Sequence, residues 1–131
     1  MDQADIIRYL NNMFPFMDQL VETEDIFETY DCENKHYIIE IKSRDKYYNP
    51  WLIEKQKLIS NLQKAKKQNK DFIYLTEYRT KIITWNINNL ISIDYDFKWQ
   101  QKLMPETTVF TDRDKVVKDV GYLYEKYAKK Y

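Results

Sequence analysis

The segment Ile38-Ile39-Glu40-Ile41-Lys42 constrains the fold more than any other part of this sequence. Its isoleucines favour a β-strand, because β-branched side chains pack well on a pleated surface. Successive strand side chains point to opposite faces, so Ile38, Glu40 and Lys42 share one face and the other two isoleucines share the second. An acid and a lysine are costly to bury in an apolar strand unless they are paired. The segment therefore predicts a sheet strand with a charged pair on one face.

Length and composition indicate one domain around this strand. The chain has 131 residues, of which 44% are hydrophobic and 16% aromatic, enough for one core with little room for a second. One Gly and three Pro leave no breaker-rich linker. We expect a single domain over residues 1–131, with a core at about 2–87 and a C-terminal extension at about 88–131.

Residue counts exclude several kinds of site. The 21 basic and 21 acidic residues cancel, whereas a protein that coats nucleic acid non-specifically is normally more basic. Any nucleic-acid contact must therefore use a local patch. One Cys excludes an intrachain disulfide and a Cys-based zinc site, and one His excludes His-rich metal sites. The lack of a Gly-rich phosphate loop argues against nucleotide-driven chemistry.

The N-terminus and the hydropathy pattern predict a cytoplasmic protein with no membrane partner. The start Met-Asp-Gln-Ala-Asp lacks the basic and apolar regions of a signal peptide. No apolar run approaches the roughly 18 residues needed to cross a bilayer. Heavy use of Lys, Asn, Ile and Tyr hints at an AT-rich genome, such as that of a bacteriophage or its host, and the phage-like case would place the chain in the host cytoplasm.

Hydrophobic periodicity and turn residues predict the order α-β-β-α-β-β-α, an α/β fold with a mixed sheet flanked by helices. We expect a helix at 2–13, strands at 25–31 and 36–43, a helix at 50–68 with Pro50 in its first turn, strands at 71–77 and 81–87, an irregular stretch at 88–110 with a short strand at 90–95, and an extra C-terminal helix. A capping box of Thr111 and Asp114 would begin that last helix.

Hairpin register selects the acid that accompanies Glu40 and Lys42. If the chain turns about residues 33–34, paired positions sum to 67 and Lys42 lies opposite Asp25. Asp31 would instead pair with His36, about 13 Å along the strand from Glu40 at 3.3 Å per residue, and is better explained as a turn residue. A slip of one residue would undo this pairing, but as it stands the register predicts Asp25 as the second carboxylate.

Two carboxylates and a lysine are the groups that metal-dependent phosphoester hydrolysis needs. Asp25 and Glu40 would bind Mg²⁺, a hard cation that prefers oxygen ligands, with Mn²⁺ as a substitute. A bound cation polarises a phosphate and lowers the pKa of a bound water. Lys42 would orient that water and stabilise the developing negative charge.

In this order the residues resemble the PD-(D/E)xK nuclease superfamily, which includes restriction endonucleases and Holliday-junction resolvases. Glu40-x-Lys42 matches the second half of the motif and Asp25 its isolated acid, over roughly residues 2–87. The resemblance implies a restriction-endonuclease-like α-β-β-α-β core and Mg²⁺-dependent hydrolysis of phosphodiester bonds, usually in DNA. Many members place a Gln or Lys on the helix after the motif, which Gln56 or Lys55 would match as a supporting site residue.

Other residues fit the resemblance less closely. The first helix offers only Asp2 and Asp5 where many members carry a Glu, and Glu22 or Glu24 could stand in for that ligand. The basic residues near the motif that would follow the DNA backbone are Arg44, Lys46, Lys55 and Lys57.

A homodimer would let two such sites cut two strands.

Two other interpretations stay open. The chain could be a catalytically weak or inactive nuclease-like protein that binds nucleic acid or serves a structural role, which the zero net charge and the missing helix acid favour. It could also be an α/β interaction domain with a chance Glu-x-Lys, which a wide separation of Asp25 and Glu40 would favour. Gln56 is explained equally well as a polar residue at the edge of the core.

Overall fold

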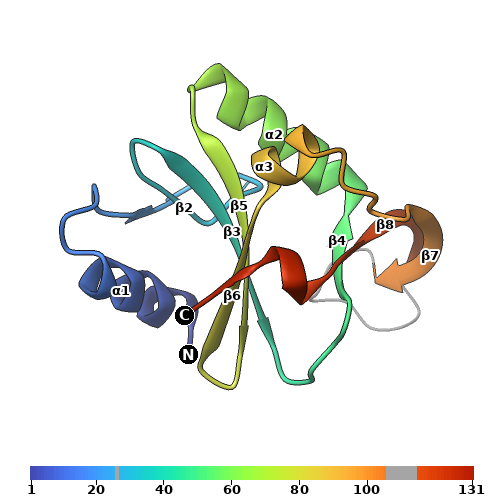
Figure 1. The fold of residues 1–131 in the computed structure, drawn as a ribbon, viewed down its shortest axis with the longest axis horizontal. Helices are drawn as coiled ribbons and strands as arrows, with labels where there is room; N and C mark the ends of the chain where they lie inside the picture. Colours follow the sequence, from blue (N-terminus) through green and yellow to red (C-terminus); the bar gives the residue numbers. More distant parts are fainter. Residues whose placement is uncertain (26, 106–114) are drawn as a thin grey trace.

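The computed structural model describes residues 1–25, 27–105 and 115–131 and has an α/β architecture with a mixed sheet (Figure 1). Within these ranges the strands of the larger sheet are β1 Val21–Glu22, β2 Cys32–Glu33, β3 Tyr37–Arg44, β5 Asp71–Tyr78, β6 Lys81–Asn86 and β9 Lys129–Lys130. The smaller sheet contains β4 Trp51–Glu54, β7 Gln100–Pro105 and β8 Lys115–Leu123. The helices are α1 Gln3–Met13, α2 Lys55–Lys67, α3 Ile87–Ser92 and the short 3₁₀ helix η2 Glu125–Tyr127.

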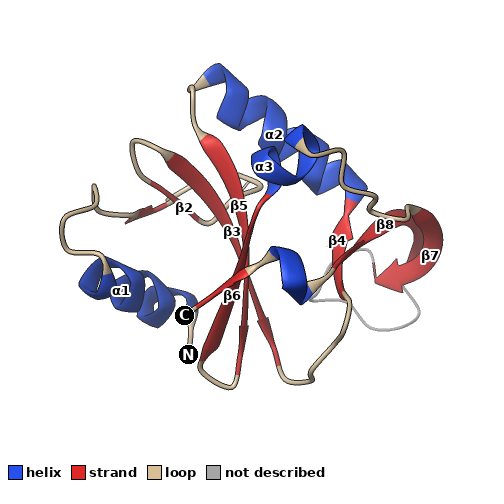
Figure 2. Cartoon of the chain, in the orientation of Figure 1, coloured by secondary structure: helices blue, strands red, loops and turns tan. Residues whose placement is uncertain are grey.

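Strand β3 lies inside the larger sheet, whose strand order is β1-β2-β3-β5-β6-β9. It runs antiparallel to β2 and parallel to β5, with Glu40 beside Tyr74 and Lys42 beside Thr76. A parallel neighbour needs a crossover connection, and the chain makes it through β4 and α2. Figure 2 shows α1 and α2 on opposite sides of this sheet.

The predicted division of the β3 side chains between two faces is confirmed. Ile39 and Ile41 belong to the core under α1, where they join Ile6 and Leu10. Ile38 belongs to the core under α2, which also contains the buried rings Phe72, Trp51 and Trp85. The two cores hold β3 from both faces, so the charged pair is carried on a strand with little freedom to move.

The smaller sheet is attached to the core beside α2. Alternate β4 residues, Trp51 and Ile53, are buried, while Leu52 and Glu54 face a pocket. The Trp51 indole N–H donates to Glu125 Oε1 at 3.1 Å, and the Trp85 indole N–H donates to the Tyr124 carbonyl at 3.0 Å. These contacts fix the β4-β8-β7 sheet next to the face of β3 that carries Glu40.

Four predicted elements match the structure within about two residues: the first helix and the strands β3, β5 and β6. The predicted strand at 25–31 is wrong, since pairing with β3 begins only at Cys32. The predicted helix at 50–68 begins at Lys55, because residues 51–54 pair with β8. The predicted strand at 90–95 is also wrong, because α3 extends to Ser92. The stretch at 88–110 is less irregular than expected, since it contains β7.

The expected C-terminal helix is a strand. Residues 115–123 form β8, which pairs with both β4 and β7. Its Val and Tyr content suits a strand, and pairing on both sides satisfies backbone groups that a helix would have satisfied internally. The expected capping residues Thr111 and Asp114 lie outside the described residues. No helix in the described ranges is long and apolar enough to cross a membrane.

The turn between β2 and β3 changes the predicted register. Asn34 is 6% exposed, and its Oδ1 accepts from the His36 and Tyr37 N–H groups at 2.9 and 2.8 Å. Its Nδ2 donates to the Asp18 carbonyl at 2.9 Å. The turn is therefore wider than residues 33–34, and Cys32 lies opposite Ile39. Paired positions shift by four residues from the prediction.

We predict that Asn34→Ala lowers the free energy of unfolding by about 1–3 kcal/mol, because buried polar groups lose their partners. Urea unfolding followed by circular dichroism measures the change. Lys35→Ala is the control, since Lys35 is exposed and surface changes usually stay within about 0.5 kcal/mol. Equal stability of the two variants would contradict a structural role for the Asn34 side chain.

Candidate functional site

Glu40 is a buried carboxylate with only one of its oxygens paired. The residue is 3% exposed, and its Oε1 lies 3.6 Å from Lys42 Nζ. Its Oε2 has no hydrogen-bond partner among the described residues. Burial raises the pKa of Glu40, while the charges of Lys42 and Lys57 oppose that rise. A buried charge with an unpartnered oxygen costs stability, and a further positive partner at Oε2 would offset that cost.

Lys42 is the principal counter-charge to Glu40 and is itself largely removed from water. Burial lowers the pKa of Lys42, and the neighbouring Glu40 carboxylate opposes that change. A buried ion pair of this kind contributes little net stability, because desolvation offsets the attraction. Retaining such a pair on a central strand is typical of a functional site rather than of a core.

Asp31, rather than Asp25, accompanies Glu40. The Asp31 N–H donates to the Ile39 carbonyl at 2.8 Å, and Asp31 Oδ2 accepts from the Ile41 N–H at 2.6 Å. These two bonds lie on either side of Glu40 along β3. Strand β2 begins only at Cys32, so the Asp31 carboxylate takes the place of a strand partner for Ile41. Burial raises the pKa of Asp31, and its charge contributes to raising that of Glu40.

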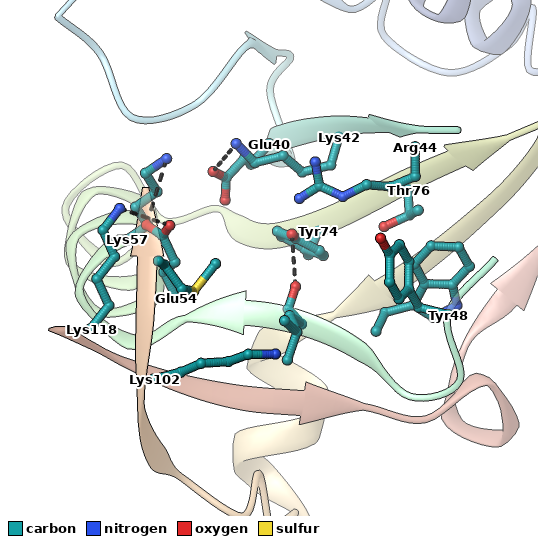
Figure 3. A pocket seen from close by; sticks show the side chains of 13 residues that line it. Glu40, Lys42, Arg44, Tyr48, Glu54, Lys57, Tyr74, Thr76, Lys102 and Lys118 are labelled. Carbon is teal, nitrogen blue, oxygen red and sulfur yellow. Dashed lines mark hydrogen bonds and ion pairs between the residues drawn. The ribbon is translucent and has the colours of Figure 1, made fainter. Parts of the chain in front are cut away.

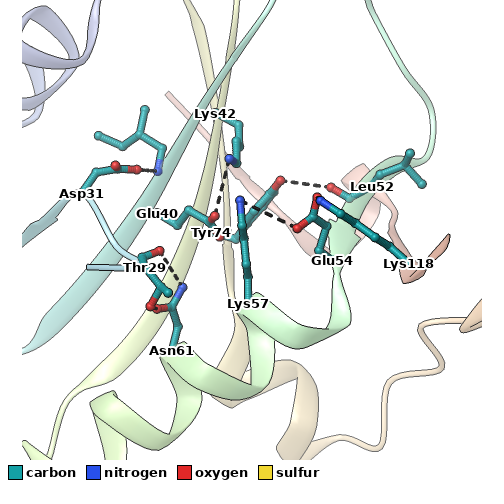
Figure 4. A network of polar contacts seen from close by, with 11 residues as sticks. Thr29, Asp31, Glu40, Lys42, Leu52, Glu54, Lys57, Asn61, Tyr74 and Lys118 are labelled. Atoms are coloured by element: carbon teal, nitrogen blue, oxygen red, sulfur yellow. Dashed lines mark hydrogen bonds and ion pairs between the residues drawn. The ribbon is translucent and has the colours of Figure 1, made fainter. Parts of the chain in front are cut away.

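The segment before Asp31 is held by helix α2 (Figure 4). Asn61, which is fully buried, donates through Nδ2 to the Thr29 carbonyl at 3.2 Å and accepts from the Thr29 hydroxyl. Lys64 donates to the Thr29 hydroxyl at 3.0 Å and pairs with Glu28. These contacts join residues 28–29 to α2 and so place Asp31 beside β3.

The predictions for Asp25 and Gln56 are corrected by their placement. Asp25 is exposed, lies before the first residue of β2, and accepts from the Phe27 N–H at 2.9 Å in a local turn. The four-residue register shift is the reason that it does not face Lys42. Gln56 is exposed because α2 starts at Lys55, which turns Leu58, Asn61 and Ala65 toward the core instead.

A pocket of about 420 Å³ opens in front of Glu40, between the two sheets (Figure 3). Its walls come from β3 and β5 on one side and from the β4-β8-β7 sheet with the start of α2 on the other. The charged side chains that line it are Glu40, Lys42, Arg44, Glu54, Lys57, Lys102 and Lys118. Five of these seven are basic, so the pocket is positive although the whole chain is neutral.

Glu54 and Tyr74 link the two walls of the pocket. Glu54 precedes α2 and lies 3.1 Å from Lys118 Nζ and 3.7 Å from Lys57 Nζ. The Tyr74 hydroxyl donates to the Leu52 carbonyl at 3.0 Å. Burial, followed by the nearby Glu40 charge, raises the pKa of Tyr74, so this phenol stays protonated. These bonds connect β5 and α2 to the smaller sheet across the pocket.

The four predicted DNA-contacting residues divide into two pairs. Arg44 and Lys57 line the pocket. Lys46 is exposed in the loop after β3, and Lys55 lies 5.4 Å from the centre of the Trp99 ring as a cation–π partner. The pocket therefore gathers only half of the basic residues chosen from the sequence.

The carboxylates of the site are few. Across residues 1–25, 27–105 and 115–131, no group of three or more His, Cys, Asp and Glu side chains is arranged to hold a metal ion. The half-buried Asp31 and the buried Glu40 remain as the two carboxyl groups, and the Asp31 charge contributes to raising the pKa of Glu40. A divalent cation would satisfy the unpartnered Glu40 Oε2, so the donor chemistry of the two carboxylates fits a cation bound by few protein ligands.

Comparison with known proteins adds no relative: no protein-family model matches the chain, and no curated protein matches it. Inference about function therefore rests on the residues of the site. From the sequence, Asp31 was considered but assigned to a turn, and Glu54, Lys102 and Lys118 were not selected. The alternation of buried and exposed residues in Trp51-Leu52-Ile53-Glu54 was an available signal for β4 and for the placement of Glu54. Lys102 and Lys118 reach the pocket only through tertiary structure.

We predict that Lys42→Met lowers the free energy of unfolding at pH 7 by about 3–5 kcal/mol, since it leaves Glu40 buried without its nearest counter-charge. The pKa of Glu40 is already raised in the folded state. The cost of its charge is therefore absent below the ordinary Glu value of 4.5 and appears as the pH rises through the folded-state pKa. The deficit should shrink as the pH falls from 7 toward 5.

Denaturant titrations of wild type and variant at several pH values measure this trend. Lys46→Met makes the same chemical change at an exposed position and should have little effect at any pH. A Lys42→Met deficit that is the same at pH 5 and pH 8 would show that Glu40 is not the group responsible.

Proposed function

We propose that this chain is a metal-dependent phosphodiesterase of the PD-(D/E)xK type that acts on DNA. The observation that carries the proposal is the buried Glu40 carboxylate, whose Oε2 lacks a hydrogen-bond partner among the described residues and whose Oε1 is next to Lys42. A buried, half-satisfied acid beside a lysine in a positive pocket is costly for folding and useful for catalysis.

Asp31 and Glu40 would hold the cation, so Asp31 takes the role first expected of Asp25. Mg²⁺, or Mn²⁺ in its place, would supply Lewis-acid stabilisation of a phosphate and a bound water of lowered pKa. The order of elements supports the resemblance: a helix, the β2–β3 hairpin with Asp31 and Glu40-x-Lys42, the helix α2, and the strand β5 parallel to β3. This order corresponds to the proposed restriction-endonuclease-like core.

The chain's own residues would then position the substrate. The Lys42 ammonium group would donate a hydrogen bond to the attacking water and stabilise negative charge on the phosphate. Lys57 and Arg44, which also line the pocket, would attract the phosphodiester backbone. The Asn61–Thr29 contacts would keep Asp31 in place. The proposal includes a homodimer, in which two such sites would cut two strands.

A second candidate is a protein of the same fold that binds nucleic acid without turnover. The specific observation in its favour is that the described residues hold no group of three metal-ligating side chains, so the cation would depend on two carboxylates. The placement of Asp25 away from the site favours a chance Glu-x-Lys, the third interpretation. The partial burial of Asp31 next to β3 opposes it, because chance does not require a second desolvated acid there.

We predict that the purified protein, tested on plasmid, branched and single-stranded DNA, cleaves at least one of these substrates with Mg²⁺ or Mn²⁺ and none with EDTA. Glu40→Gln, Asp31→Asn and Lys42→Met should each reduce the rate by about 10²-fold or more, as removal of one group that stabilises a transition state does. Asp25→Asn and Gln56→Ala are matched controls that should stay close to wild type, since both residues are exposed. Gel-resolved time courses measure the rates.

The pattern of losses separates the candidates. Wild type that cuts no DNA with either metal would eliminate the enzyme and leave the binding protein. Loss of activity in Asp25→Asn with full activity in Asp31→Asn would return the site to the register expected from sequence.

We also predict that Mg²⁺ stabilises the wild-type fold. A ligand that binds only the folded state at ten times its dissociation constant stabilises by about 1.4 kcal/mol. The rise in melting temperature should disappear in Glu40→Gln and Asp31→Asn and persist in Asp25→Asn. Differential scanning calorimetry at matched ionic strength measures it, with NaCl replacing MgCl₂ in the control. An equal Mg²⁺ shift in all variants would place the cation elsewhere.

A further inference from the structure

The depth of the pocket limits what can reach Glu40. Glu40 and Tyr74 are each 3% exposed and Thr76 is 1% exposed, so the acid lies at the base of the pocket and not on an open surface. The volume of about 420 Å³ is within the range of sites for small molecules, about 300–1,000 Å³. A space of this size takes one or two nucleotides. A rigid duplex does not fit into a space of this size, so the acid at its base is reached by one unpaired strand.

The smaller sheet is the reason for this restriction. It brings Lys102 of β7 and Lys118 of β8 to face β3, which carries Lys42 and Arg44 (Figure 3). Basic side chains therefore line both walls of the pocket, whereas the acids Glu40 and Glu54 are engaged by Lys42 and by Lys118 and Lys57. Lys42 and Arg44 are two residues apart on one strand face, about 6.6 Å at 3.3 Å per residue. Such a row suits the phosphates of one extended strand.

An aromatic surface lies at the other end of the pocket from Glu40. Tyr48 lines the pocket, is 46% exposed, and packs edge-on against Trp51 with ring centres 5.7 Å apart. Tyr47 is 50% exposed and packs on the same Trp51 ring at 5.5 Å. A buried tryptophan thus supports two exposed tyrosine rings. Unpaired bases stack on exposed aromatic rings of this kind, whereas bases within a duplex have no free face.

From these features we infer that the pocket between the two sheets binds a single-stranded segment of DNA, with its phosphates along Lys42, Arg44 and Lys102 and a base on Tyr48. The inference deepens the proposed function and rests on it for the cleavage step alone. The substrate class is an unpaired strand, such as an overhang, a flap or a frayed end, and the β4-β8-β7 sheet is what excludes paired DNA from Glu40.

Binding tests the inference independently of catalysis. Fluorescence anisotropy in EDTA would compare a labelled 20-nucleotide single strand with a blunt duplex of the same sequence, using the full chain. We expect the single strand to bind at least tenfold more tightly. Tyr48→Ala should weaken its binding about 5- to 140-fold, the range for loss of one stacked base. Lys102→Ala should reduce the slope of log K against log salt by about 0.7.

Matched controls lie on other surfaces. Tyr9 is 38% exposed on α1, and Lys67 is exposed in the last turn of α2. Tyr9→Ala and Lys67→Ala should bind the single strand as wild type does. Thermal unfolding of all four variants checks that they are folded. Equal affinity for strand and duplex would overturn the inference, as would equal effects of the site variants and the controls.

A cleavage assay distinguishes single-strand binding from the proposed nuclease activity. A duplex with a single-stranded overhang should be cut with Mg²⁺ within the overhang, and the blunt duplex should stay intact. Tight binding of the single strand without any cleavage would overturn the nuclease proposal and support single-strand binding in the pocket. Mg²⁺-dependent cutting of the blunt duplex at the same rate as the overhang would support the nuclease proposal and overturn the preference for a single strand.

Discussion

The pair formed by Glu40 and Lys42 on β3 is the interaction on which the site depends. The cores on both sides of the sheet offset the cost of burying it. Two charges are removed from water, and one carboxylate oxygen has no partner among the described residues. Such a pair gives little net stability. The isoleucines on either side of Glu40 are buried against α1, and Ile38 is buried under α2. The apolar burial of β3 therefore offsets the charged burial.

The smaller sheet turns this charged strand into a pocket. Its strands come from the middle and the end of the chain, yet β4 and β8 pair directly, and Trp51 and Leu123 enter the core beneath α2. The same alternation that buries Trp51 and Ile53 turns Leu52 and Glu54 toward Glu40. Positive charge accumulates there while the chain as a whole stays neutral. A zero net charge thus gave no indication of the local potential.

The local sequence pattern predicted an element correctly where hydrophobic periodicity alone defines that element. Helix α1, with its Asp2–Asp5 capping box, and the apolar strands β3, β5 and β6 were predictable because periodicity alone defines them. Prediction failed at residues 25–31 and 115–123. The first segment precedes a turn built by the Asn34 side chain and Asp18, which sets its register, and the second segment takes its strand partners from distant parts of the chain. Neither kind of contact is visible in a local window.

The sequence by itself determined that Glu40 and Lys42 share a strand face, because side-chain alternation is a local property of extended backbone. Only the tertiary structure decided which acid joins them. The contacts of Asn61 and Lys64 with Thr29, together with the Asp31–Ile41 bond, bring Asp31 to the strand and leave Asp25 exposed. Register depends on turn geometry and on side chains far away in sequence, which is why the partner, unlike the pair, required the folded chain.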